Sequence, residues 1–157
     1  MIVFSRLLPF LIVLSVFTAD RFTKILVKAK MFYGQPQELL PFFSLTHVEN
    51  TGAAFGLGQN QNVFFIVSSI LILIILFAFA QKVAMENVRV KSALALVIGG
   101  ALGNLYDRLR QGSVTDFLDF YIGSHHWPAF NVADSSIFMG AVLLVLFEWQ
   151  AKSIEKS

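Results

Sequence analysis

The sequence predicts an all-α integral membrane protein, a bundle of four transmembrane helices with a small β-rich extracytoplasmic loop region. Hydrophobic residues make up 56% of the 157 positions and charged residues only 14%, with a mean hydropathy of +0.69. In soluble domains, by contrast, about a quarter of the residues are charged. Four segments approach the roughly 20 apolar residues needed to cross a bilayer. A chain of this length is expected to form a single membrane-embedded domain, residues 1–157.

The first apolar segment, residues 7–27, is interpreted as a retained transmembrane helix. The alternative is a cleaved signal peptide whose basic region is Arg6. Removal of such a peptide requires small residues one and three positions before the cut. A cut after Ala19 would place the large Phe17 at the third position, so a retained helix is the better interpretation.

The other three predicted spans are residues 63–80, 92–106 and 132–147. The span 63–80 contains no charged residue and is the clearest of the four. The span 92–106 carries Ala95, Gly99 and Gly103 at intervals of four residues. Small residues at this spacing allow two helix backbones to approach closely, so this face is expected to be a helix contact.

The positions of Lys and Arg in short loops indicate the orientation, because cytoplasmic loops carry an excess of these residues. With four spans, most of the basic residues lie on the side that holds both termini, which is therefore predicted to be cytoplasmic. These residues are Arg6, Lys82, Arg89, Lys91, Lys152 and Lys156. Lys28, Lys30, Arg108 and Arg110 lie on the opposite side and weaken the bias.

Two longer connections then face outward. The first, residues 28–62, contains the β-prone stretch 42–48, which is expected to form short strands. The second, residues 107–131, contains an apolar run at 117–122 that suits the membrane interface.

Ionisable and amide side chains gather at the outer end of the predicted bundle, although such groups are costly at membrane depth and need partners or a function. They come from the first, third and fourth spans and from both outer loops. They are Asp20, Arg21, Lys24, Glu49, Asn50, Asn104, Asp107, Arg108, Asp116, Asn131 and Asp134. This convergence predicts a functional site at the outer membrane surface.

Several of these residues also have a purely structural interpretation. Asp20 and Lys24 are four residues apart and can pair on one helix face. Asn131 and Asp134 have the spacing of a helix capping box. Ser113 and Asp116 share that spacing, so each acid alone fits a helix start.

Other chemistries have weaker support. The chain has no cysteine, which excludes disulfides and thiolate chemistry. Glycine-rich phosphate loops and serine nucleophile elbows are absent from the sequence. The net charge of +2 gives no reason to expect a nucleic-acid partner. The adjacent His125 and His126 are weak candidates for metal ligands.

Five motifs resemble those of the lipoprotein signal peptidases, or signal peptidase II family, and the resemblance extends over essentially the whole chain. In order along the sequence, the motifs are Asp20-Arg21-x-x-Lys24, Asn50-Thr51-Gly52-Ala53-Ala54-Phe55, Gly103-Asn104-x-x-Asp107-Arg108, Gly112-x-Val114-x-Asp116-Phe117 and Trp127-Pro128-x-Phe130-Asn131-x-Ala133-Asp134. Two residues depart from the family pattern: Arg21 stands where Gln is frequent, and Tyr106 where an aliphatic residue is common.

The resemblance implies an aspartic endopeptidase whose catalytic pair is Asp116 and Asp134. The residues that would bind substrate or support the pair are Asn50, Asn104, Arg108, Asn131, Asp20, Lys24, Gly52 and Asp107. The implied substrate is a prolipoprotein with a diacylglyceryl-modified cysteine, cleaved just before that cysteine. No metal or other cofactor is implied. The resemblance also implies a multi-pass enzyme of the bacterial inner membrane, in contact with membrane lipid, and we expect it to act as a monomer.

Three other functions remain open at the sequence level. A small transporter or channel would use the same acids in an ion path, but such a path should place ionisable groups along the whole membrane depth. A metal-dependent hydrolase would combine Asp116 and Asp134 with His125 and His126. A structural subunit would have no need of acids near the membrane.

Overall fold

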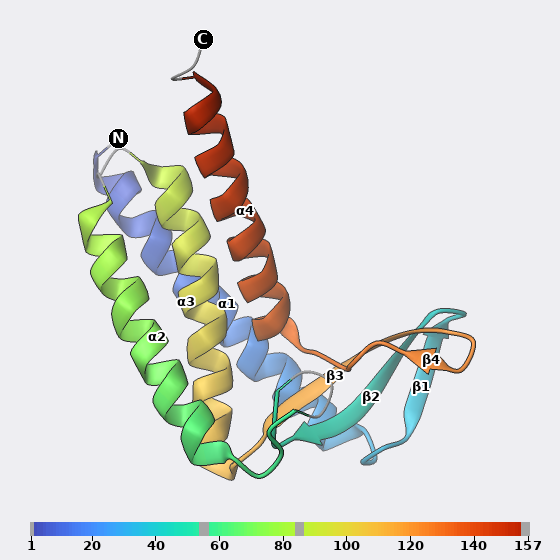
Figure 1. Ribbon diagram of the computed structural model, residues 1–157. Helices are drawn as coiled ribbons and strands as arrows, with labels where there is room; N and C mark the ends of the chain where they lie inside the picture. The colour runs from blue at the N-terminus through green and yellow to red at the C-terminus, as the bar shows by residue number, and fades with distance from the viewer. Residues whose placement is uncertain (1, 54–56, 84–86, 155–157) are drawn as a thin grey trace.

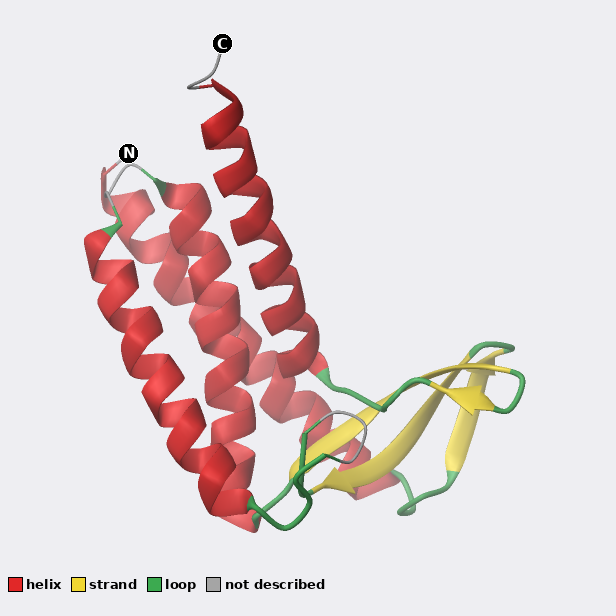
Figure 2. Ribbon diagram, viewed as in Figure 1, coloured by secondary structure: helices red, strands yellow, loops and turns green. Residues whose placement is uncertain are grey.

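The computed structural model describes residues 2–53, 57–83 and 87–154. In these residues it forms a four-helix bundle with a four-stranded sheet at one end (Figures 1 and 2). The elements are α1 (Ile2–Lys30), β1 (Pro36–Leu40), β2 (Phe43–Asn50), α2 (Asn62–Lys82), α3 (Val88–Gln111), β3 (Val114–Ile122), β4 (His125–His126) and α4 (Val132–Ile154). Both ends of the chain lie at the end of the bundle opposite the sheet. The predicted fold class is confirmed.

The helices extend beyond the predicted spans because each continues past its apolar stretch into polar residues. Among the described residues, α2, α3 and residues 132–150 of α4 are long and apolar enough to cross a membrane. Helix α1 is 29 residues long, and Asp20, Arg21 and Lys24 follow its apolar stretch. These three residues lie in the half of α1 nearer the sheet, where they meet α3.

Helix α3 is the central element of the bundle and packs against α1, α2 and α4. Its small residues make this possible. A Cβ atom at Gly99 would lie 2.9 Å from Cβ of Val16 in α1, and one at Gly100 would lie 2.3 Å from the carbonyl oxygen of Ala133 in α4. The predicted contact face of α3 is confirmed, and it brings α1 and α4 together around the sheet end of α3.

The sheet is antiparallel with strand order β1-β2-β3-β4. The stretch 42–48 was predicted to be β-prone and forms most of β2, while the apolar run 117–122 lies within β3. The pairing of β2 with β3 aligns Leu45 with Leu118 and Val48 with Asp116, so its register shifts between these pairs. A bulge of this kind redirects side chains, and it falls beside Asp116.

A tight turn connects α3 to β3. Gly112 has φ 80°, the left-handed conformation that ends helices most easily with glycine, and its N–H donates to the Arg108 carbonyl at 3.1 Å. Strand β3 begins two residues later. Asp116 therefore lies on a strand, and Ser113 donates its hydroxyl to Glu49 at 2.6 Å. The helix-start interpretation of Ser113 and Asp116 was wrong, because the chain turns into the sheet at this point.

Candidate active site

Asp134 lies in the first turn of α4, where it forms the predicted capping box with Asn131. The Asn131 N–H donates to Asp134 Oδ2 at 3.2 Å, and the Asp134 N–H donates to Asn131 Oδ1 at 2.9 Å. This reciprocal pair fixes the start of the helix. The second oxygen, Asp134 Oδ1, accepts a hydrogen bond from Asn104 Nδ2 of α3 at 2.7 Å. The capping role therefore leaves this carboxylate available for further contacts.

Asp116 lies on β3, close to the end of the bundle, and its side chain is almost completely buried. Asn131 Nδ2 donates to its Oδ1 at 2.7 Å, and Asn50 Nδ2 donates to its Oδ2 at 3.0 Å. The same Asn131 amide also lies 3.2 Å from Asn104 Oδ1. Two asparagines thus connect the two acids, so that Asp116 and Asp134 belong to one hydrogen-bonded network.

The loop after β2 is held in place by the same network. Asn50 Oδ1 accepts the Gly52 N–H at 2.9 Å, and the Gly52 carbonyl accepts from Arg108 Nη2 at 3.2 Å. A Cβ at Gly52 would lie only 2.5 Å from the Leu57 carbonyl oxygen, so a side chain here would displace the loop. The Arg108 guanidinium also lies over the ring of Phe65, 5.2 Å from its centroid. Arg108 and Gly52 therefore position the loop that follows Asn50.

A fully buried lysine, Lys24, contacts the network through Asn104. Lys24 Nζ lies 2.8 Å from Asp20 Oδ2, 2.8 Å from Asp107 Oδ2 and 3.0 Å from Asn104 Oδ1. A buried ammonium is tolerated only when its charge and its three protons find partners, and these three groups satisfy it. The predicted Asp20–Lys24 pair is confirmed. Because Lys24 fixes the Asn104 oxygen, it also directs the Asn104 amide towards Asp134.

Asp20 and Asp107 extend this support to the backbone beside Asp116 and Asp134. Asp20 Oδ1 accepts the N–H of Ala133, next to Asp134, at 3.0 Å. Asp107 Oδ2 accepts the N–H of Thr115, next to Asp116, at 3.4 Å. The ion cluster between α1 and α3 thus holds the backbone on one side of each acid.

The electrostatic environment of Asp116 favours a shared proton. Burial and the nearby charge of Asp134 raise the pKa of Asp116 to about 7, although hydrogen bonds from Asn50 and Asn131 oppose the shift. Two adjacent carboxyl groups that cannot both ionise cheaply retain one proton near neutral pH. Burial and the Asp134 charge thus both favour the protonated form of Asp116.

Asp116 faces a cleft of about 590 Å³ between the sheet and the segment that precedes α4. Its wall combines the loop after β2 with β3 and the chain around Trp127. The lining residues are Tyr33, Val48, Glu49, Asn50, Thr51, Ala53, Gln59, Asp116, Asp119, His126, Trp127, Pro128 and Ala129.

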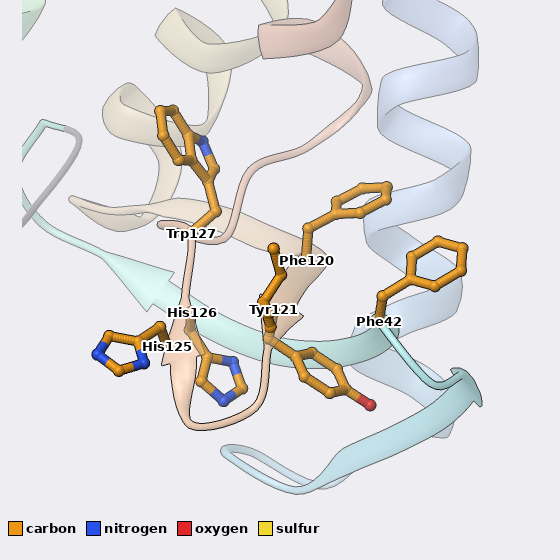
Figure 3. Close-up of a pocket in the computed structure, with 7 residues that line it drawn as sticks. Phe42, Phe120, Tyr121, His125, His126 and Trp127 are labelled. Carbon is orange, nitrogen blue, oxygen red and sulfur yellow. The ribbon is translucent and has the colours of Figure 1, made fainter.

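A second, mostly aromatic hollow of about 490 Å³ adjoins the cleft around the β3–β4 turn (Figure 3). His126 and Trp127 line both hollows. The rings of His125 and His126 point away from each other, as expected for consecutive residues of a strand. Among the described residues no group of three His, Asp or Glu side chains is placed to hold a metal ion. The geometry thus gives no support to the metal-dependent alternative.

The sequence matches known proteins over most of its length. The family model described as signal peptidase (SPase) II matches residues 12–150. The lipoprotein signal peptidase of Shewanella amazonensis is 44% identical over 146 residues, covering 90% of this chain and 87% of that protein. The lipoprotein signal peptidase of Alteromonas mediterranea is 42% identical over 134 residues, covering 83% and 74%. The chain belongs to the signal peptidase II family.

A solved structure gives the same result for the fold. A bacterial membrane enzyme determined by the in meso method superposes with a TM-score of 0.86 at 36% identity, covering 92% of this chain and 89% of the other. As a member of the signal peptidase II family, the chain is a multi-pass bacterial membrane enzyme of the aspartic peptidase class. This assignment decides against the transporter and the structural-subunit alternatives.

The two departures from the signal peptidase II pattern contact each other. The Arg21 guanidinium lies 4.6 Å from the centroid of the Tyr106 ring and forms an ion pair with Asp107. Phe17 packs edge-on against the same ring. The two unusual residues therefore form one packed unit that supplies a charge partner to Asp107. Ala54 and Phe55 of the second motif lie outside the described residues.

The sequence reasoning missed a second polar cluster on the sheet. Glu49 accepts hydrogen bonds from Ser113 and Thr115 and forms an ion pair with Lys28 at 2.9 Å. Burial would raise the pKa of Glu49, but these contacts and His47 outweigh it and lower the pKa. The position of Glu49 directly before Asn50 was visible in the sequence, but its partners come from α1, α3 and β3 and only the fold brings them together.

Proposed function

We propose that Asp116 and Asp134 are the catalytic pair of this signal peptidase, and that it removes the signal peptide of diacylglyceryl-modified prolipoproteins by cleaving just before the lipidated cysteine. The observation that carries the proposal is the asparagine-linked pair of acids, of which Asp116 lines the cleft. Because its pKa is raised to about 7, Asp116 can hold the proton that such a pair needs at neutral pH.

In the proposed mechanism, the ionised acid takes a proton from a water molecule held between the two carboxyl groups. The water oxygen attacks the carbonyl carbon of the scissile bond, while the protonated acid donates a hydrogen bond to the carbonyl oxygen. The tetrahedral intermediate then collapses, the C–N bond breaks, and the leaving amine takes up a proton from the pair. Each turnover consumes one water molecule and returns the single proton to the two acids.

The asparagines fix the orientation of the two carboxyl groups by hydrogen bonds. Asn131 and Asn50 occupy one position on each oxygen of Asp116, and Asn104 does the same for one oxygen of Asp134. Each carboxylate oxygen has further lone pairs, which remain for the water and the substrate. Lys24 acts through Asn104 and is a positioning residue.

The proposed substrate explains the position of the site at the end of the bundle. A diacylated cysteine keeps the substrate in the bilayer, so its scissile bond stays at a fixed depth near the outer surface. We propose that both termini are cytoplasmic and that the sheet lies on the outer side of the inner membrane. The basic residues Lys82, the last of α2, and Arg89 and Lys91, in the first turn of α3, lie on the side of the termini and support this orientation. We expect the enzyme to act as a monomer in contact with lipid.

The test is the processing of a lipidated prolipoprotein in liposomes by Asp116→Asn and Asp134→Asn. Each variant removes one member of the pair with little change in shape, so the rate is expected to fall by about 100- to 10,000-fold, the usual contribution of general acid–base catalysis. Glu38→Gln, which neutralises an exposed acid on β1, is the matched control and should keep the wild-type rate. Near-normal turnover by both aspartate variants would refute the proposed pair. The same assay with EDTA should show undiminished activity.

A further inference from the structure

Asp119 forms a second carboxylate centre on the sheet, separate from the catalytic network. Its side chain is buried, and its Oδ2 accepts hydrogen bonds from Ser44 at 3.1 Å and from Thr46 at 3.3 Å, both on β2. His126 Nδ1 on β4 lies 2.9 Å from Oδ1. Three strands therefore hold one carboxylate, and the proposed hydrolysis uses none of these four residues.

This centre lies in the same cleft as Asp116. Asp116, Asp119 and His126 all line it, together with Trp127. Asp119 follows Asp116 by three residues along β3, which corresponds to about 10 Å of extended chain. A peptide that lies along β3 with its scissile bond at Asp116 therefore reaches Asp119 after about three residues.

The charges around the cleft are unequal. Its lining includes the acids Glu49, Asp116 and Asp119, and the described lining residues include no Lys or Arg. Lys28 offsets the charge of Glu49, and Asp116 shares its proton with Asp134. At Asp119 the group that can offset the charge is the imidazole of His126, whose side chain is half exposed. This part of the cleft therefore repels anions and attracts cations.

The position of the sheet decides which part of the substrate reaches this centre. The sheet extends sideways from the bundle at the end opposite both termini (Figure 1). If the proposed function holds, the signal peptide occupies the membrane beside the helices, and only the chain that follows the scissile bond extends over the sheet.

From these observations we infer that Asp119, held by Ser44, Thr46 and His126, is a specificity-determining subsite for the mature part of the prolipoprotein. It receives the second to fourth residue after the scissile bond and favours a cationic side chain over an acidic one. This inference rests on the proposed function, because it takes the cleavage site and the direction of the substrate from it.

The experiment compares pairs of lipidated precursors that are identical except for one Lys or one Asp. The charge is placed in turn at the second, third and fourth residue after the scissile bond, and kcat/KM is measured in neutral-lipid liposomes. For the wild-type enzyme the Lys substrate should be preferred by about three- to tenfold at one of these positions, the range of a single partly exposed charge interaction. The ratio of the two substrates is independent of how much enzyme is correctly folded.

The variants separate this subsite from a structural role. In Asp119→Asn the preference should disappear at that position, mainly through KM, with kcat for a neutral substrate largely retained. In His126→Gln the preference should increase, because the group that offsets the charge of Asp119 is removed while an amide donor remains. Glu38→Gln, which neutralises an acid of the same sheet outside the cleft, should leave every ratio unchanged.

The experiment distinguishes failure of the proposed function from failure of the Asp119 subsite. If the wild-type enzyme cleaves no lipidated precursor, the proposed function is wrong. If it cleaves the Lys and Asp substrates equally at all three positions, or if Asp119→Asn keeps the wild-type preference, the subsite is wrong and the proposed function is untouched.

Discussion

At the scale of single residues, the site depends on how one carboxyl group is kept from ionising. Asp116 combines almost complete burial with the charge of Asp134, and the two effects together move its pKa to about 7 in spite of two amide donors. The asparagines orient the two carboxyl groups but do not offset their charge, since an amide donates a hydrogen bond without neutralising a carboxylate. This division of roles explains why three asparagines and two aspartates meet at one point.

The raised pKa of Asp116 predicts how the rate depends on pH. Below about pH 7 the pair retains its single proton, and above it the proton is lost and the acid partner disappears. We therefore expect kcat to fall by about tenfold for each pH unit above this value, and to fall again at low pH when the second acid becomes protonated. Liposome assays at saturating substrate test this, and a rate that continues to rise above pH 9 would contradict it.

At the scale of elements, the site is assembled by close packing of α3 against its neighbours. Gly100 touches the backbone of α4 at Ala133, the residue before Asp134. Gly103 leaves room for the Asp20 carboxylate, which a Cβ there would approach to 2.6 Å. Small residues in α3 therefore determine both the bundle geometry and the space in which the buried ions sit.

Gly100→Ala tests this packing. The added Cβ would lie 2.3 Å from the Ala133 carbonyl oxygen, so α4 must move and take Asp134 with it. We expect a loss of about 1–3 kcal/mol in the free energy of unfolding, as for other overpacked contacts, together with reduced processing. Ala78→Val, on the exposed face of α2, is the control and should change neither. Wild-type stability and activity of Gly100→Ala would show that this contact does not position the acid.

At the scale of the whole molecule, the apolar surface and the polar groups lie in different places. The apolar helices present exposed hydrophobic side chains around their circumference, most completely in α2, which buries none of its residues. The polar groups are gathered where α1, α3, α4 and the sheet meet. The buried acids thus lie at one end of the bundle, away from the exposed apolar faces of the helices.

The absence of cysteine provides a direct test of the proposed orientation. Single cysteines are introduced as Glu38→Cys on the sheet and Lys82→Cys at the last residue of α2. A membrane-impermeant maleimide added to spheroplasts should label the first and spare the second until the cells are lysed. The reverse pattern would place the sheet in the cytoplasm.

The sequence was sufficient to predict the four helices, the capping box of Asn131 and Asp134, and the Asp20–Lys24 pair, because each depends on local spacing. It also predicted which polar residues gather at one end. It was not sufficient for the Asn131–Asn104 link, the three partners of Asp119 or the Arg21–Tyr106 contact. These join residues far apart in the chain, and they depend on a strand bulge and on helix packing that spacing alone does not show. Ser113 and Asp116 misled for the same reason, since a capping-box spacing also occurs at the start of a strand.

The central claim is that Asp116 and Asp134 share one proton, and the most direct test is to titrate Asp116 itself. Carboxyl-¹³C NMR of aspartate-labelled enzyme, assigned with Asp116→Asn, gives its pKa in the wild type and in Asp134→Asn. We expect Asp116 to titrate near pH 7 in the wild type and at a clearly lower pH once the Asp134 charge is removed. If Asp116 titrates at the same pH in both proteins, the two acids do not share a proton and the proposed mechanism is wrong.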